Sequence, residues 1–185
     1  MQILKKIVNL RVNFLLILYA VIFISAQIDA AREYQIKATF LFNFTQFVEW
    51  PSESFSSPQS PAVIGILGKD PFGQYLEQAI SGESLDKHPL IIKRFNSVEE
   101  INNCHVLFIA SGKNKTEDVL QKLKGKNILT VSDAGNFTKL GGMVRLYTKN
   151  DKINIQINLE AAKAENLAIS SKLLKLAEIV KTDKK

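Results

Sequence analysis

The sequence has few of the residues that build disulfide frameworks, metal sites and nucleophilic active sites. Its 185 residues include one cysteine, two histidines and one tryptophan. One cysteine cannot form a disulfide within the chain. The two histidines and the cysteine show no H-x-x-x-H or C-x-x-C spacing, so neither a zinc site nor a haem site is expected. We therefore predict no metal and no cofactor.

Long apolar runs are also scarce, and the one that exists stands near the start of the chain. Residues 14–24 are eleven consecutive apolar residues, preceded by three cations and followed by small residues. Eleven helical residues rise about 16 Å, roughly half of a hydrocarbon core, as in a secretory signal peptide. We predict a signal peptide over residues 1–26, with cleavage as late as about residue 31, and hence export to the periplasm. An uncleaved N-terminal anchor is the alternative.

The rest of the chain has the length of one domain, which we place at residues 33–181. The net charge is +6, and it falls to +3 when the three cations of the predicted signal peptide are removed. This modest excess of positive charge favours solubility and does not indicate a nucleic-acid-binding surface, so no nucleic-acid partner is expected.

Strand-like and helix-like segments alternate through the first part of the predicted domain. Continuous apolar runs, typical of strands buried on both faces, alternate with amphipathic or capped helical segments. Asp70 and Pro71 are predicted to begin one of these helices, as N-cap and first helical residue. The predicted strands are 62–68, 90–95, 105–110 and 127–132, and the predicted helices are 34–49, 70–81 and 116–124.

The alternation changes after Gly141. Residues 143–148 and 152–157 are rich in β-branched residues and flank a polar turn, so we predict a hairpin. Residues 159–167 and 169–180 are predicted to be helices, the second because its apolar residues recur at helical spacing. The predicted fold is a single layered α/β domain. It has a mixed, mostly parallel sheet, helices on both faces, and a C-terminal hairpin plus helices.

The predicted helix before Pro51 is unusually aromatic, with four phenylalanines and a tryptophan between residues 37 and 51. Such a helix is either central in its own domain or covered on one face by a second copy or another protein. Its apolar stripe is predicted to contain Ile36, Phe40, Phe44 and Phe47, and its thin polar seam Lys37, Thr39, Asn43, Gln46 and Glu49.

Cys104 and His105 are adjacent on a predicted strand, where neighbouring side chains point to opposite faces. They are therefore not expected to form a nucleophile–base pair. Cys104 is predicted to be a buried apolar residue, with intermolecular pairing as the alternative.

Three other segments resemble sites only weakly. The glycines between Gly65 and Gly73 follow a strand, but their spacing fits a tight turn and helix cap better than a phosphate-binding loop. Ser132 and Asp133 end a strand with no histidine placed to activate the serine, so turn and capping roles are favoured. Glu99 and Glu100 are predicted to be solvated. Nothing assembles nucleophile, base and oxyanion donors, so we predict no enzyme.

Several motifs together resemble the YfiR-like family of periplasmic proteins over about residues 33 to 180. They are KATFLFNFTQFVEWP, IGILGKDPFG, CHVLFI, LTVSD, GGMVRLY, INIQINLEAA and LAISSKLLKLA. The resemblance implies a non-enzymatic regulator that binds the periplasmic portion of an inner-membrane signalling enzyme. That enzyme is a diguanylate cyclase or a sensor kinase. Repression of a cyclase would keep cyclic-di-GMP and biofilm formation low.

The resemblance further implies a homodimer, an outer-membrane lipoprotein as a second partner, and redox control through disulfides. This chain departs from the family in having one cysteine, so control by an intramolecular bridge is in doubt. It also has Asn166 where the family often has glycine; asparagine tolerates the left-handed conformation second best, so we expect the turn to survive.

The predicted partner- or dimer-binding residues are Phe40, Asn43, Phe44, Phe47 and Trp50, chosen because a broad aromatic face invites a partner. A periplasmic small-ligand sensor with a pocket lined by Phe72, Tyr75 and Trp50 is the alternative function. A hydrolase using Ser132 and Asp133 is the third and weakest.

Overall fold

The computed structural model describes residues 29–112 and 115–181, so residues 1–26 of the predicted signal peptide lie outside the described residues. The chain divides into two compact units, residues 1–34 and 35–185. In the first unit, the described residues 29–34 are helical. No helix within the described ranges combines the length and apolar character that crossing a bilayer requires.

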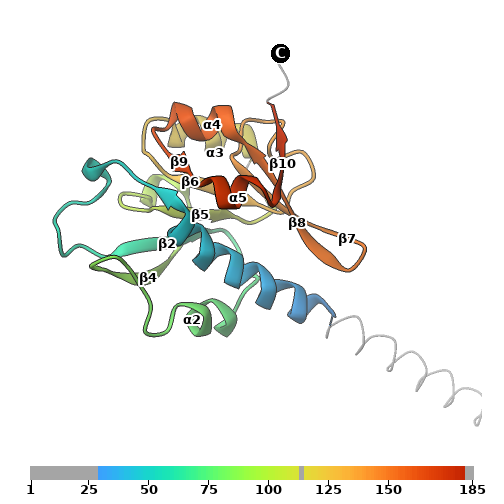
Figure 1. The fold of residues 1–185 in the computed structure, drawn as a ribbon, viewed down its shortest axis with the longest axis horizontal. Coiled ribbons are helices and arrows are strands. Elements are labelled where there is room, and N and C mark those ends of the chain that lie inside the picture. Colours follow the sequence, from blue (N-terminus) through green and yellow to red (C-terminus); the bar gives the residue numbers. More distant parts are fainter. Residues whose placement is uncertain (1–28, 113–114, 182–185) are drawn as a thin grey trace, which may run out of the picture. The chain divides into compact units, whose positions relative to one another are not determined.

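The second unit is built on an eight-stranded sheet with the order β10-β8-β7-β6-β5-β2-β4-β3 (Figure 1). The central strands β4, β2, β5, β6 and β7 are parallel, and β7 and β8 form an antiparallel hairpin. The mixed, mostly parallel sheet is confirmed. The bounds are β2 Ala62–Leu67, β3 Ser84–Leu85, β4 His88–Phe95, β5 Val106–Ile109, β6 Leu129–Ser132, β7 Val144–Lys149, β8 Lys152–Asn158 and β10 Ala177–Val180.

Helices cover both faces of this sheet, as the sequence predicts. On one face, Val119 and Leu123 of α3 (Thr116–Leu123) pack in a core cluster with Val63 and Leu107. Figure 1 shows α3 and α4 (Leu159–Ala164) on one side and α2 (Gln74–Ile80) on the other. Every residue of β2, β5 and β6 is buried, which explains why these strands are continuous apolar runs and do not alternate.

Asparagines set two of the turns near the C-terminus. Asn150 and Asp151 have φ of 53° and 57°, the left-handed conformation of a two-residue hairpin turn between β7 and β8. Asn166 has φ of 54°, so the turn expected to survive there is formed. Asn158 caps α4 by accepting a hydrogen bond of 3.1 Å from the backbone N–H of Ala161.

The long C-terminal helix predicted for residues 169–180 is wrong. Ile169 belongs to the two-residue strand β9 (Ala168–Ile169), and Ser170 caps the four-residue helix α5 (Ser171–Leu174). Residues 177–180 then form β10, which pairs parallel with β8. Pairing with an available sheet edge therefore overrides the helical spacing of the apolar residues.

Two other helices begin or end at residues different from those predicted. The helix after β2 begins at Gln74, because Asp70 Oδ1 accepts a hydrogen bond of 2.7 Å from the backbone N–H of Phe72 and holds a local turn instead. The aromatic helix, residues 35–47 of the second unit, ends two residues earlier than predicted. Its last predicted residues form β1 (Val48–Glu49), which pairs antiparallel with β9.

Candidate functional site

The aromatic helix buries one side in the core. Ala38, Leu41 and Phe44 have no exposed surface, and Thr45 is also buried. Phe44, one of the predicted partner-binding residues, therefore offers no side-chain surface to a partner in this conformation. Part of the aromatic content of the helix is accounted for by its own domain.

Lys37, predicted to be part of a thin polar seam, lies on this buried side of the helix. Its side chain is 2% exposed, and its Nζ lies 2.8 Å from Asp133 Oδ2, whose side chain is 17% exposed. Asp133 follows the C-terminal end of β6, so the ion pair ties the aromatic helix to the sheet. A buried ammonium needs such a partner because burying an unpaired charge is costly.

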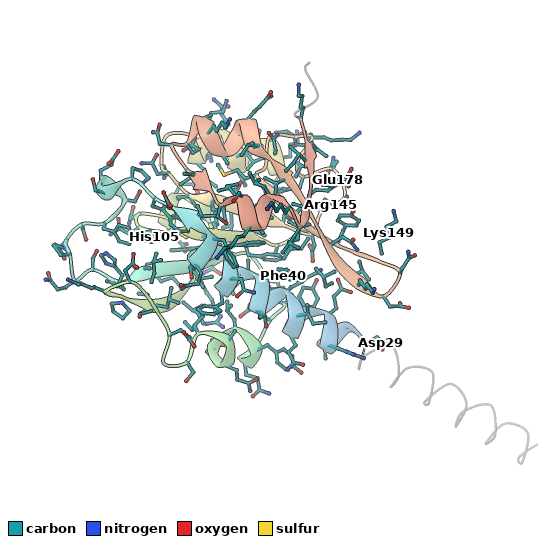
Figure 2. All side chains as sticks on the ribbon, viewed as in Figure 1. Asp29, Phe40, His105, Arg145, Lys149 and Glu178 are labelled. Atoms are coloured by element: carbon teal, nitrogen blue, oxygen red, sulfur yellow. The ribbon has the colours of Figure 1, made fainter. Side chains whose placement is uncertain are left out.

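A second side of the helix carries apolar surface that the core does not cover. Ile36 is 40% exposed, and Phe40, Asn43 and Phe47 are half-buried. These four residues, spaced i, i+4, i+7 and i+11, fall on one line along the helix; we call them the helix stripe. Figure 2 shows Phe40 in the middle of the helix, and its ring lies 6.2 Å from that of the buried Phe44. Three of the five predicted residues thus lie together at the surface.

Trp50, the fifth predicted residue, belongs to a different neighbourhood. Its ring meets His105 edge-on at 5.9 Å, Phe55 lies 4.4 Å from His105, and Phe55 stacks on His88 at 3.9 Å. We call these four side chains the aromatic–histidine cluster. It holds the loop after the aromatic helix against the amino ends of β2, β4 and β5. The sequence alone does not reveal this cluster, because its members come from three separate segments.

Cys104 and His105 do not form a catalytic pair. The buried Cys104 Sγ lies 3.3 Å from the carbonyl oxygen of Val106, and burial raises the pKa of the thiol to about 12. His105 Nδ1 instead accepts a hydrogen bond of 3.0 Å from the backbone N–H of Val63. A thiol that stays protonated is a poor nucleophile, so the arrangement argues against thiolate chemistry.

The other segments weighed as sites have structural roles. Ser132 Oγ donates a hydrogen bond of 2.7 Å to the carbonyl oxygen of Ile109, and accepts one of 3.3 Å from the backbone N–H of Ala134. Glu99 pairs with Lys122 at 2.6 Å on the surface. The part of the chain that the structure describes contains no group of three or more histidine, cysteine, aspartate or glutamate side chains arranged to hold a metal ion.

Phe72 and Trp50, two of the three residues predicted to line a ligand pocket, pack against different neighbours. Phe72 is buried with its ring 4.8 Å from that of Phe108. A groove of about 560 Å³ lies elsewhere, between α3, α4 and the segment 140–143. The carboxylate of Glu165 at its rim already accepts hydrogen bonds of 2.8 and 3.1 Å from the backbone N–H groups of Gly125 and Asn127.

A second exposed apolar surface lies at the β10 edge of the sheet. Leu176 is 74% exposed and Ile179 is 49% exposed. Arg145 and Glu178, labelled near this edge in Figure 2, are joined through Gln156, which accepts from Arg145 at 3.0 Å and donates to Glu178 at 3.0 Å. The helix predicted for residues 169–180 does not leave such a surface at a sheet edge, so this surface was not predicted. The β-branched pair at residues 179 and 180 was the available signal.

Comparison with known protein families gives a match over most of the chain. The family model described as DUF4154, YfiR/HmsC-like, matches residues 34–178. No curated protein matches the chain.

Proposed function

Because the chain belongs to the YfiR/HmsC-like family, we propose that it represses an inner-membrane diguanylate cyclase by binding that enzyme's periplasmic portion. The family is one of periplasmic, non-catalytic regulators that act with such cyclases. The family match over residues 34–178 is the observation that carries the proposal. The engaged side chains of Ser132 and Cys104, each hydrogen-bonded within the core, support a binding role over catalysis.

We infer that the helix stripe is the surface that meets the partner. Its three apolar members lie in one line around Asn43, so one contact could cover all of them. Burying the exposed part of Ile36 and the half-buried rings of Phe40 and Phe47 adds apolar contact, worth about 25 cal/mol per Å² before association costs. The half-buried amide of Asn43 offers directional hydrogen bonds in the middle of that contact.

The ion pair beneath the stripe supports the same inference. The ion pair of 2.8 Å between Lys37 Nζ and Asp133 Oδ2 fixes the aromatic helix on the sheet. The helix stripe therefore lies on a helix whose position is already fixed before a partner binds. A preorganised surface loses less conformational entropy on binding.

The test is recovery of a membrane partner by the tagged mature protein from detergent-solubilised native membranes, identified by mass spectrometry. A cyclase or sensor kinase with a periplasmic portion should be recovered by the unaltered protein and lost with Phe40→Asp. Cellular cyclic-di-GMP should rise when the protein is removed and stay high when only Phe40→Asp is supplied. Phe40 is the better choice than the core residue Phe44, because its half-buried ring can be replaced with less damage to the fold.

Leu176→Asp is the matched control, since it places the same charge on an exposed apolar residue of the β10 edge. Loss of the partner with Leu176→Asp but not with Phe40→Asp would move the proposed surface to the β10 edge. No membrane signalling enzyme recovered by any version, with cyclic-di-GMP unchanged, would contradict the proposed function.

We propose further that the chain is exported by cleavage of its first 26 to 31 residues, works as a homodimer, and can be sequestered by an outer-membrane lipoprotein. Sequencing the N-terminus of the periplasmic form tests the first point, and light scattering tests the second. Capture of a lipoprotein from outer-membrane extracts tests the third.

A further inference from the structure

A cavity of about 150 Å³ lies beneath the loop of residues 51–61, beside the amino end of β2. Six of the eight residues that line it are polar or charged, among them Ser54, Lys93, Asn103 and His105. Its volume is that of several water molecules at roughly 30 Å³ each, enough for a small polar molecule. None of the described residues that line it is acidic.

The ring of His105 presents a fixed hydrogen-bond donor on this side of the molecule. Val63 donates its backbone N–H to Nδ1 at 3.0 Å, so Nδ1 must be unprotonated and the neutral ring carries its hydrogen on Nε2. The side chain is 2% exposed, and Nε2 has no hydrogen-bond partner within the described residues. A buried N–H that is left unpaired is costly, so this atom calls for an acceptor.

Burial, with a smaller contribution from the neighbouring His88, lowers the pKa of His105 to about 4. The nearby backbone of Ser54 raises this pKa by a smaller amount, but it does not reach hydrogen-bond geometry at Nε2. The ring is therefore neutral near pH 7, and its N–H donor is permanent there.

Two further donors share the cavity. Ser54 Oγ is buried and has no hydrogen-bond partner within the described ranges. Lys93 extends from β4 with an exposed side chain, and its ammonium has three donors and a positive charge. A cavity with a buried N–H, a buried hydroxyl, a cation and no carboxylate favours an anion with several acceptor oxygens.

We propose that this cavity binds a small oxyanion, a phosphate or a short carboxylate, held by His105 Nε2–H, the Ser54 hydroxyl and the Lys93 ammonium. The site is separate from the helix stripe. It does not rest on the proposed repression of a cyclase, and either proposal can fail alone.

Trp50 provides the readout. It is the only tryptophan in the sequence, and its ring meets His105 edge-on at 5.9 Å. An oxyanion bound to Nε2 changes the field and packing at that contact, so it should change Trp50 fluorescence.

The experiment is a titration of the mature protein with sodium phosphate, and separately with sodium acetate, at pH 7.5 in Tris chloride of constant ionic strength. Trp50 fluorescence and calorimetry are both recorded. We expect saturable binding of at least one oxyanion, and a rise of at least tenfold in its Kd for Lys93→Gln and for Ser54→Ala. Lys152→Gln, at an exposed lysine of β8, is the matched control and should leave the Kd within twofold.

Each outcome of the titration either supports or overturns the oxyanion site. Phosphate alone identifies a tetrahedral oxyanion, acetate alone identifies a carboxylate, and either supports the site. Binding of neither anion by either readout overturns the proposal, because the cavity then holds only water. An equal loss of affinity in Lys93→Gln and Lys152→Gln also overturns it, since the effect is then general charge screening. Ser54→Ala removes only one oxygen, so it tests the site even where a larger change at His105 would prevent folding.

Discussion

The stability of this protein should fall as the pH drops from 8 to 5, and His105 should be the largest single cause. His105 is buried, and its Nδ1 is occupied by the N–H of Val63. Protonating the ring in the folded state would place a second hydrogen between these two nitrogens. The unfolded chain has no such restriction and takes up the proton with an ordinary pKa.

The magnitude follows from the pKa. Burial, with His88, lowers the pKa of His105 from 6.5 in the unfolded chain to about 4 in the folded protein. Between these values the unfolded state binds more protons, so the free energy of unfolding rises with pH across the window. The loss is about 2 kcal/mol between pH 8 and pH 5, and about 3 kcal/mol once both states are protonated.

The assay is urea unfolding at pH 8, 7, 6 and 5, followed by Trp50 fluorescence and by circular dichroism. The same series is run on His105→Asn, whose amide oxygen can still accept from Val63 but does not titrate. The unaltered protein should lose about 2 kcal/mol more than the variant over this range.

Equal pH dependence in the two proteins, within about 0.5 kcal/mol, would refute the reasoning, because His105 would then have the same pKa folded and unfolded. A stability that increases toward pH 5 only in the unaltered protein would refute it too. That result would mean the folded state prefers the protonated ring.

Three further predictions concern the core. Gly142→Ala should lower the free energy of unfolding by about 1–3 kcal/mol, because an added Cβ would overlap the ring of Phe137. Gly135→Ala is the control in the same urea series, because a Cβ added there has no neighbouring atom within 4 Å. Equal losses of stability in the two variants would count against steric overlap. Phe44→Ala should cost about 3–5 kcal/mol, since the ring has no exposed surface; a cost below about 1 kcal/mol by calorimetry would contradict that placement. Cys104 should resist labelling by a thiol reagent at pH 8 until urea unfolds the protein, because the pKa of its buried thiol is raised to about 12; rapid labelling of the folded form would disprove this.

The sequence predicts the centre of the fold well and its periphery poorly. The segments that form β2, β5 and β6 are largely apolar because both faces of these strands are buried. Such continuous runs can be recognised from the local sequence alone. The segment 177–180 is ambiguous locally. Its apolar spacing fits a helix, and only the unpaired edge of β8 makes it a strand.

The placement of individual side chains is likewise predictable where it depends on local sequence and unpredictable where it depends on long-range contacts. The sequence predicts that the aromatic helix is too apolar for one buried face, and the structure places Phe40, Asn43 and Phe47 on the helix stripe. It does not predict that Lys37 is buried, because the partner Asp133 lies 96 residues away. The aromatic–histidine cluster is hidden for the same reason, since long-range contacts join its segments.

The two-residue ladder of β1 and β9 has a consequence for the order of folding. It joins Val48 to Ile169 and Glu49 to Ala168, and the backbone N–H of Ser170 adds a hydrogen bond of 2.9 Å to the carbonyl oxygen of Phe47. Closing so long a loop costs chain entropy, and so few hydrogen bonds cannot repay it before the intervening sheet exists. The ladder should therefore form late, and on a growing chain it cannot form until residues 168–170 have been synthesised. Until then, the C-terminal end of the aromatic helix has no strand with which to pair.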